Sequence, residues 1–237
     1  MKTETAKSTK GTVLLKAFLC LLCLLWLRPL SIQAQSTFTL DQVFAKMDGV
    51  AKDFHSVESD LERTHVTVLV NDKDVSSGKF YYVRQGKEPR VKMELTKPAL
   101  QKLLIDKGKL QLYEPNINQV KQGSLSGHQD LVETYMSLGF GQSSQELKNN
   151  FDVSLAGEET VDGRKTTMLE LKPKTSKSFK AIRLWIDQQK WITYQIRITD
   201  TSNDYSVLKY SNAKLNGNIP DSVFDLKLPK NVNVVKF

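Results

Sequence analysis

Hydrophobic positions along the chain follow two different periods, and the change between them divides the sequence into elements. From Thr39 to Phe54 the apolar residues recur every three or four positions, which predicts an amphipathic helix. Thr39 is suited to cap this helix, and Asp41 lies in its first turn. After the helix, apolar and polar residues alternate, as they do in half-buried strands. The sequence therefore predicts one helix followed by a long run of strands.

The alternation predicts two groups of strands, separated by a stretch near the middle of the chain. The first group is expected over residues 66–70, 79–83, 90–95, 103–105, 110–113 and 117–121, with a polar turn at 71–78. The second group is expected over residues 151–155, 166–171, 181–187, 191–199 and 205–212, followed by a short terminal piece at 223–228. Because the connections are short, the strands should be antiparallel neighbours.

The stretch between the two groups predicts two more short helices, His128–Leu138 and Ser143–Asn149, with glycines around them. One sheet of about twelve strands must close or cover its concave face. Three helices are too few to cover it everywhere, so they are expected to cap one open side. The predicted fold class is mainly β (α+β): an incomplete antiparallel β-barrel, or strongly curved sheet, capped by about three helices.

The first residues have the three parts of a secretory signal peptide. Basic residues precede the apolar run Val13–Leu27, and the small-residue exit Ser31-Ile32-Gln33-Ala34 follows it. We expect residues 1–34 to be this signal and residues 35–237 to form a single domain in the periplasm. An uncleaved membrane anchor is the alternative, but the run is shorter than the ~20 apolar residues that a spanning helix needs.

Composition then narrows the function classes. The only cysteines, Cys20 and Cys23, lie in the predicted leader, so the mature chain would have neither disulfides nor cysteine-bound metals. The leader holds five of the 34 basic and one of the 26 acidic residues, which leaves a formal charge of +4. The basic residues are dispersed along strands rather than clustered, and this argues against a nucleic-acid partner.

No motif in the sequence points to catalysis. The His-Glu-x-x-His, phosphate-loop and Gly-x-Ser-x-Gly patterns are missing, and His55, His65 and His128 have no spacing typical of metal ligands. We therefore expect no catalytic residue, no metal and no cofactor. Asp187 and Asp200 flank one predicted strand and could suggest a glycan hydrolase, although turn formation explains such positions better.

The candidate functional residues are apolar and aromatic. Alternation places large apolar side chains on one face of several predicted strands, where they could fill a core or line a cavity for a ligand. The candidate lining residues in strands are Phe80, Tyr82, Val91, Met93, Leu95, Ile192, Tyr194 and Ile196. Those in the second predicted helix are Leu131, Tyr135 and Met136. Methionines such as Met93 suit a pliable lining.

Several stretches, taken in order, resemble the periplasmic outer-membrane lipoprotein carrier family (LolA-type). These are Gly78-Lys-Phe-Tyr-Tyr-Val-Arg84, Lys97-Pro98, Leu103-Leu-Ile-Asp106 with Gly108, Leu110-Gln-Leu-Tyr-Glu-Pro115, and Pro220-Asp-Ser-Val-Phe-Asp-Leu-Lys-Leu-Pro229. The sequence departs from the family pattern at Gln85, where a proline usually follows the arginine, and at Lys107, which interrupts the usual Asp-Gly pair.

The resemblance implies an open half-barrel that binds the acyl chains of lipoproteins and carries them across the periplasm without catalysis. It implies an inner-membrane donor complex and an outer-membrane acceptor as partners, and we expect a monomer. Arg84 matches the family arginine that tethers the helical cover. Two alternatives remain: a related lipid-binding sorting protein or envelope-stress sensor and, less favoured, the glycan hydrolase.

Overall fold

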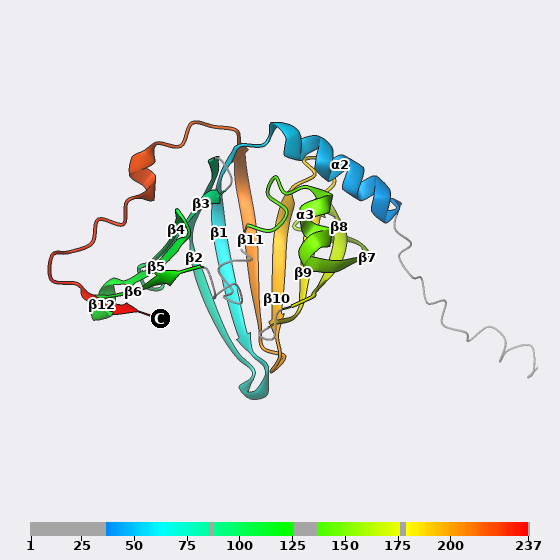
Figure 1. Cartoon of the computed structure of the whole chain (residues 1–237). Coiled ribbons are helices and arrows are strands. Elements are labelled where there is room, and N and C mark those ends of the chain that lie inside the picture. The colour runs from blue at the N-terminus through cyan, green and yellow to red at the C-terminus, as the bar shows by residue number, and fades with distance from the viewer. Residues whose placement is uncertain (1–36, 86–87, 126–136, 176–178, 237) are drawn as a thin grey trace, which may run out of the picture. The chain divides into compact units, whose positions relative to one another are not determined.

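A computed structural model of the chain describes residues 37–85, 88–125, 137–175 and 179–236 (Figure 1). The described residues contain two α-helices, α2 (Leu40–Asp53) and α3 (Ser144–Asn150). They also contain twelve strands: β1 (Ser56–Thr67), β2 (Asp72–Gln85), β3 (Glu88–Lys97), β4 (Gln101–Asp106), β5 (Lys109–Glu114), β6 (Gln119–Ser124), β7 (Phe151–Val161), β8 (Arg164–Pro173), β9 (Phe179–Asp187), β10 (Thr193–Asp200), β11 (Tyr205–Leu215) and β12 (Asn233–Lys236). Among these residues, neither α-helix is long and apolar enough to cross a membrane.

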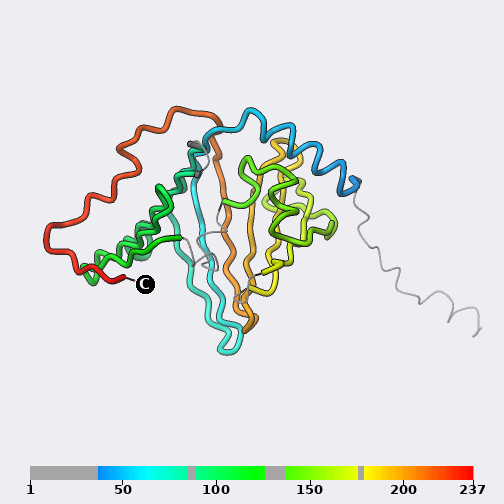
Figure 2. Tube along the Cα trace, in the orientation of Figure 1, coloured from blue at the N-terminus to red at the C-terminus, as the bar shows by residue number. Residues whose placement is uncertain are grey.

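All twelve strands belong to one sheet with the order β12-β6-β5-β4-β3-β2-β1-β11-β10-β9-β8-β7. Every neighbouring pair is antiparallel except β12 and β6, which are parallel. The order begins at β12 and ends at β7 without pairing them, so the curved sheet stays open, as Figures 1 and 2 show. The predicted incomplete antiparallel barrel is confirmed.

One face of the sheet, here called the inner face, carries the main hydrophobic core. Ten of the strands, all except β6 and β12, contribute buried apolar side chains to it. Alternation produces this face: in β9, for example, Ile182, Leu184 and Ile186 are all fully buried. Burial of such side chains contributes roughly 1.5–3 kcal/mol each, so the inner face is the main source of stability.

Residues 40–54 and 137–150 lie over the inner face and are here called the cover. Helix α2 begins with a capping box between Thr39 and Gln42, as the sequence predicts for Thr39, and buries Val43, Phe44 and Met47 against the sheet. Helix α3 is tied to α2 because Ser144 donates from its backbone N and Oγ to the Asp48 carboxylate, at 2.6 and 2.7 Å. The two helices therefore form one connected unit.

The opposite, outer face carries a second apolar cluster. Leu104, Tyr113 and Val120 from β4–β6 pack against Phe224 and Leu226. The latter two belong to residues 216–236, here called the C-terminal segment, which runs across this part of the sheet before β12 pairs with β6 (Figure 2). The sequence predicts a terminal piece at 223–228; the structure instead has a 3₁₀ turn, η4 (Asp221–Phe224), and a strand further on, at β12.

The predicted first hairpin is wrong in its position. Residues 66–70 are predicted as a strand and 71–78 as a turn, but β1 ends at Thr67 and the turn is the 3₁₀ segment η1 (Val68–Val70). Asn71 closes this turn in the left-handed conformation, and β2 begins immediately after it. The end of the hairpin extends into solvent, where Leu69 is 94% exposed, so its side chains do not follow the burial that alternation assumes.

Two predictions concern residues outside those described. The predicted leader, residues 1–34, is one. The other is most of the predicted helix His128–Leu138; within its described end, Ser137 and Leu138 lie in a turn. The third predicted helix, Ser143–Asn149, agrees with α3.

Candidate functional site

The candidate lining residues in the strands are all buried, and seven of the eight belong to the inner-face core. Their exposed fractions range from 0% for Phe80 and Ile196 to 6% for Tyr194. Phe80, Tyr82, Val91, Met93 and Leu95 occupy neighbouring positions on β2 and β3, and Phe80 is paired directly with Met93. Leu131, Tyr135 and Met136 lie outside the described residues. In this structure the inner face is covered by protein, so a ligand there would have to displace the cover.

Phe140 is a fully buried residue of the cover that packs against aromatic side chains of the inner face. Its ring lies 5.5 Å from the ring of Phe80 and 4.9 Å from that of Tyr210, measured between centroids. Phe54, just after α2, completes the group at 6.4 Å. Phe140 is not among the residues that the sequence pattern predicts for the site. Its only local signal is its position between two glycines.

Those glycines let the chain of the cover approach the sheet closely. Gly139 and Gly141 both have positive φ, 78° and 66°. A Cβ on Gly139 would lie 1.9 Å from Thr193 Oγ1, and one on Gly141 would lie 2.2 Å from Phe54 Cδ1. Thr193 also donates a buried 2.8 Å hydrogen bond from Oγ1 to the Leu138 carbonyl oxygen. Only glycine satisfies both the backbone conformation and the space at these positions.

Arg84 connects the sheet to the end of α2. Its Nη1 donates a 3.0 Å hydrogen bond to the carbonyl oxygen of Ala51, in the last turn of the helix. A Cβ on Gly141 would lie 2.9 Å from Arg84 Nη2, so the guanidinium also lies beside the other half of the cover. Because the last carbonyls of a helix have no partner within it, they accept such donors readily. The contact joins β2 to α2, and a tethering role for Arg84 stays a prediction.

Two buried tyrosines of the inner face have raised pKa values. Burial raises the pKa of the Tyr82 hydroxyl, and the neighbouring Arg84 guanidinium offsets only part of this rise. Burial also raises the pKa of Tyr210, which is 1% exposed. Both hydroxyls are therefore protonated at neutral pH. The face offers hydrocarbon and aromatic surface rather than charge.

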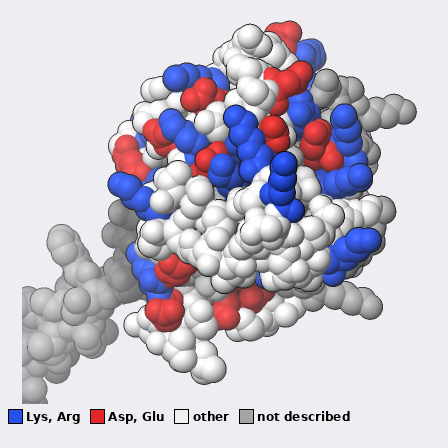
Figure 3. Space-filling view, turned by 90° about the vertical axis from the view of Figure 1, so that its left-hand side faces the viewer, with Lys and Arg blue, Asp and Glu red and all other residues white. Residues whose placement is uncertain are grey.

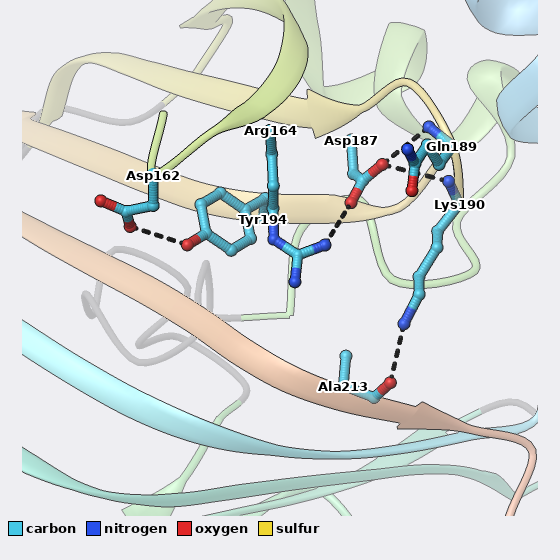
Figure 4. Close-up of polar contacts among 7 residues, drawn as sticks. All are labelled: Asp162, Arg164, Asp187, Gln189, Lys190, Tyr194 and Ala213. Carbon is cyan, nitrogen blue, oxygen red and sulfur yellow. Dashed lines mark hydrogen bonds and ion pairs between the residues drawn. The ribbon is translucent and has the colours of Figure 1, made fainter. Parts of the chain in front are cut away.

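Strict alternation predicts that Tyr194 shares a face with Ile192 and Ile196. In the structure it does not. The pairing of β9 and β10 shifts by one residue between Thr193 and Gln195, so the alternation is broken at Tyr194. The Tyr194 hydroxyl donates to Asp162 Oδ2 at 2.8 Å, and the Arg164 guanidinium lies 5.1 Å from its ring, away from the inner-face core (Figure 4). Tyr194 thus belongs to a polar group at the ends of β7–β10.

The two aspartates that could suggest a hydrolase both stabilise turns. Asp187 Oδ1 accepts hydrogen bonds from the backbone N atoms of Gln189 and Lys190, and its Oδ2 accepts one from Arg164 (Figure 4). Asp200 accepts in the same way from the backbone and side chain of Ser202. Asp187 is also the only buried carboxylate among the described residues. Both positions are explained by turn chemistry, as expected.

The described histidines make ordinary local contacts. His55 Nδ1 lies 3.3 Å from the carbonyl oxygen of Asp53, and His65 Nδ1 lies 3.0 Å from Ser206 Oγ. His128 lies outside the described residues. Within the part of the chain that the structure describes, no three His, Cys, Asp or Glu side chains are grouped so that they could hold a metal ion.

The chain is similar to a known protein family and to individual proteins. The family model of the outer membrane lipoprotein carrier protein LolA matches residues 56–227. An outer-membrane lipoprotein carrier protein of Cupriavidus pinatubonensis is 30% identical over 161 residues, which are 68% of this chain and 70% of that protein. An uncharacterized protein of Methanocaldococcus jannaschii is 26% identical over 124 residues, 52% of this chain. The match spans only 34% of that relative's own length.

Solved structures share the fold at low sequence identity. An uncharacterized conserved protein from Thermus thermophilus has a TM-score of 0.52 and 15% identity, with 83% of this chain and 98% of that one covered. MucB has a TM-score of 0.50 and 12% identity, with 82% and 64% covered. At such identities the likeness shows the fold alone. The match to the family model shows the family, because it extends from the first residue of β1 into the C-terminal segment. The chain belongs to the LolA family of outer membrane lipoprotein carrier proteins.

Proposed function

We propose that this protein is a non-catalytic carrier that holds the acyl chains of lipoproteins, or of other lipids, against its inner face. The observation that carries the proposal is the extent of that face. Ten strands contribute buried apolar side chains to one continuous core, and within the part of the chain that the structure describes it is covered by α2, α3 and residues 137–143. The name of the Cupriavidus relative describes the same task.

The energetics of such cargo favour a large apolar face. Each CH₂ group of an acyl chain gains about 0.8 kcal/mol on burial, so a multi-acyl anchor exposed to water costs on the order of tens of kcal/mol. Hydrogen bonds to a head group could not supply this energy. A face of aliphatic and aromatic side chains can do so, and Met93, which belongs to it, adds adaptable contacts.

Binding would require the cover to move, because the lining residues are buried beneath it. The acyl chains would take the place of apolar cover side chains such as Phe140. Among the described residues, the polar contacts that resist this movement include Arg84 and Asn216, which donate to the α2 carbonyls of Ala51 and Asp53, and Thr193, which donates to Leu138. Lys174 also donates from its backbone N and Nζ to the carbonyl oxygens of Asn150 and Lys148 at the end of α3. Cargo would then shift the protein from a closed to an open state by the difference in its affinity for the two.

The remaining parts of the proposal concern location and partners. We propose that residues 1–34 direct export and are removed, that residues 35–237 act in the periplasm as one domain, and that an inner-membrane donor and an outer-membrane acceptor exchange cargo with it. Family membership supports this setting. The turn roles of Asp187 and Asp200 support a function without catalysis, because they leave the hydrolase alternative without its acid pair.

Uptake of a triacylated lipopeptide tests the proposal. The purified protein is mixed with a fluorescent triacyl lipopeptide, and the soluble complex is separated from free lipopeptide by gel filtration and weighed by native mass spectrometry. We expect a complex of one protein with one lipopeptide. The peptide without acyl chains is the control, and it should not bind. Absence of a complex, or equal binding of the unacylated peptide, would contradict the proposal.

Delivery separates a carrier from a lipid-binding sensor. After loading, the complex is mixed with vesicles, and the fluorescence that becomes vesicle-bound is followed with time. A carrier should release its cargo to acceptor membranes or to an acceptor protein extracted from the outer membrane. A protein that binds the lipopeptide but never releases it to either would favour the sensor alternative.

A further inference from the structure

A pocket lies on the outer face, on the side of the sheet opposite to the proposed cargo. It lies between the outward positions of β4–β6 and the C-terminal segment, is partly open to solvent, and has a volume of about 910 Å³. Cross-strand pairs build its floor: Leu104 pairs with Gln111 and Gln111 with Gln122, while Asp106 pairs with Lys109 and Lys109 with Ser124. Its size is within the range of small-molecule sites.

One side of the pocket is apolar. Phe224 and Leu226 of the C-terminal segment and Leu104 of β4 line it, and each is 4–5% exposed. Leu228 extends this side. Figure 3, which faces the side of the molecule where β12 and the C-terminal segment lie, shows an area free of charged side chains with Lys and Arg groups next to it.

The rest of the pocket is polar, with unused donors. Gln111 Nε2 donates to Gln122 Oε1 at 3.0 Å, which leaves the Gln122 amide nitrogen and the Gln111 amide oxygen free for other partners. Four lysines line the pocket: Lys107, Lys109, Lys227 and Lys236. Among the described residues, none of the four takes part in an ion pair.

The acidic residues of the pocket do not balance these lysines. The carboxylate of Asp106 is compensated by Arg90, whose Nε lies 3.0 Å from Asp106 Oδ1. Asp225 is the one other acid in the lining, and its Oδ1 accepts from the backbone N of Lys227. The lining therefore holds four lysines and one carboxylate without a basic partner, so its charge favours an anion.

From this lining we propose that the outer pocket, the space bounded by Leu104, Lys109, Gln122, Phe224, Leu226 and Lys227, binds a small anionic amphiphile. Its phosphate or carboxylate head would lie among the lysines and Gln122, and a single apolar chain would lie against Leu104, Phe224 and Leu226. A nucleotide fits less well. The Arg90 guanidinium already lies over the Phe224 ring at 4.3 Å, so a base cannot stack on that face of the ring.

This site is independent of the proposed carrier function because it uses none of the inner-face residues. Glycine amides in the two regions allow the sites to be told apart by ¹H–¹⁵N NMR. Gly108 and Gly123 line the outer pocket, whereas Gly139 and Gly141 belong to the cover. A ligand in the outer pocket should shift the first pair, and a ligand on the inner face should shift the second pair.

The experiment titrates the ¹⁵N-labelled protein with decyl phosphate below its micelle concentration. We expect saturable shifts of the Gly108 and Gly123 amides. The variant carrying Lys109→Gln and Lys227→Gln should bind about tenfold more weakly. Lys73→Gln, an exposed lysine at the distant β1–β2 hairpin, is the matched control and should bind as the parent does. Inorganic phosphate and the uncharged decyl maltoside test the head and the chain separately, and each should bind much more weakly than decyl phosphate.

Three results would overturn the inference. Shifts confined to Gly139 and Gly141 would place the amphiphile on the inner face only. Equal affinity for decyl phosphate in the double-lysine variant and in Lys73→Gln would show that Lys109 and Lys227 do not contribute to binding. Equal binding of inorganic phosphate or of decyl maltoside would show that the pocket does not select an anionic amphiphile. None of these results bears on whether the lipopeptide binds the inner face.

Discussion

Arg84, at the end of β2, donates a 3.0 Å hydrogen bond to the carbonyl oxygen of Ala51 in the last turn of α2. It joins the sheet to the helix that covers it. Because a hydrogen bond from a charged donor contributes about 1.5–3 kcal/mol, its loss should change how often α2 leaves the sheet.

The first prediction concerns this contact. Arg84→Leu should speed amide hydrogen exchange in residues 40–54 by about 10- to 100-fold, measured by mass spectrometry of that peptide. Arg183→Leu is the control. It removes an arginine that is 40% exposed and paired with Glu170, a contact worth less than about 1 kcal/mol, and it should leave this exchange unchanged. Equal exchange in both variants would mean that Arg84 does not hold α2.

The second prediction compares two glycines with similar backbone angles. Gly141 and Gly163 have φ of 66° and 76°, but only Gly141 has neighbours within 4 Å of the position of a Cβ. Gly163→Ala should cost about 1–2 kcal/mol of unfolding free energy, from the backbone alone. Gly141→Ala should cost about 1–3 kcal/mol more, because the new methyl group meets Phe54. Urea unfolding measures both, and equal costs would contradict close packing of the cover.

The third prediction concerns Phe140. Phe140→Ala should lower the unfolding free energy by about 3–5 kcal/mol, since a fully buried ring leaves a cavity. It should also increase the rate of lipopeptide uptake, because the cover loses its ring contacts with Phe80 and Tyr210 on the inner face. The control is Leu69→Ala at the hairpin tip, which should change stability by less than about 0.5 kcal/mol. A similar cost for both variants would show that Phe140 does not anchor the cover.

The sequence predicts the main features of the fold because alternation is strong where strands face the core. The open antiparallel sheet, the helix with its Thr39 cap and the burial of Phe80, Met93 and Ile196 all follow from it. Alternation is uninformative where strands leave the core. The polar residues 71–78 look like a turn but lie mostly in β2, whose outer end pairs only with β1 in solvent.

The site is harder to predict because its decisive contacts join distant segments. A one-residue shift in pairing moves Tyr194 off the inner face, and no local pattern marks such a bulge. Phe140 packs against Phe54, Phe80 and Tyr210, which are far apart in sequence. The outer pocket likewise depends on residues 224–228 lying across β4–β6. The candidate tethering role of Arg84 can be predicted only from the family resemblance.

The fourth prediction concerns alkaline pH. Burial and the hydrogen bond to Asp162 raise the pKa of Tyr194 to about 12, from 10.0. Because the folded-state pKa is the higher one, the contribution of Tyr194 to stability is complete below pH 10 and is lost as the pH rises to 12. Tyr194→Phe has no proton to lose. Its unfolding free energy should therefore fall less steeply than that of the parent between pH 9 and pH 11.5, measured by urea unfolding.

Absorbance of tyrosinate provides the control for this prediction. Asp162→Asn removes the carboxylate that accepts from Tyr194, so the pKa of Tyr194 should move back toward 10. Burial raises the pKa of Tyr210 as well, so in every variant part of the fall of the unfolding free energy at alkaline pH should remain. An identical slope in the parent and in Tyr194→Phe would exclude Tyr194 as a source of alkaline instability.

Photocrosslinking tests the central claim most directly. A triacyl lipopeptide with a diazirine near the end of one acyl chain is bound to the protein, irradiated, and mapped by mass spectrometry after digestion. The account predicts adducts on inner-face residues such as Phe80, Met93 and Ile196. Adducts confined to outer-face residues such as Leu104 and Tyr113, or no protein adducts at all, would contradict it.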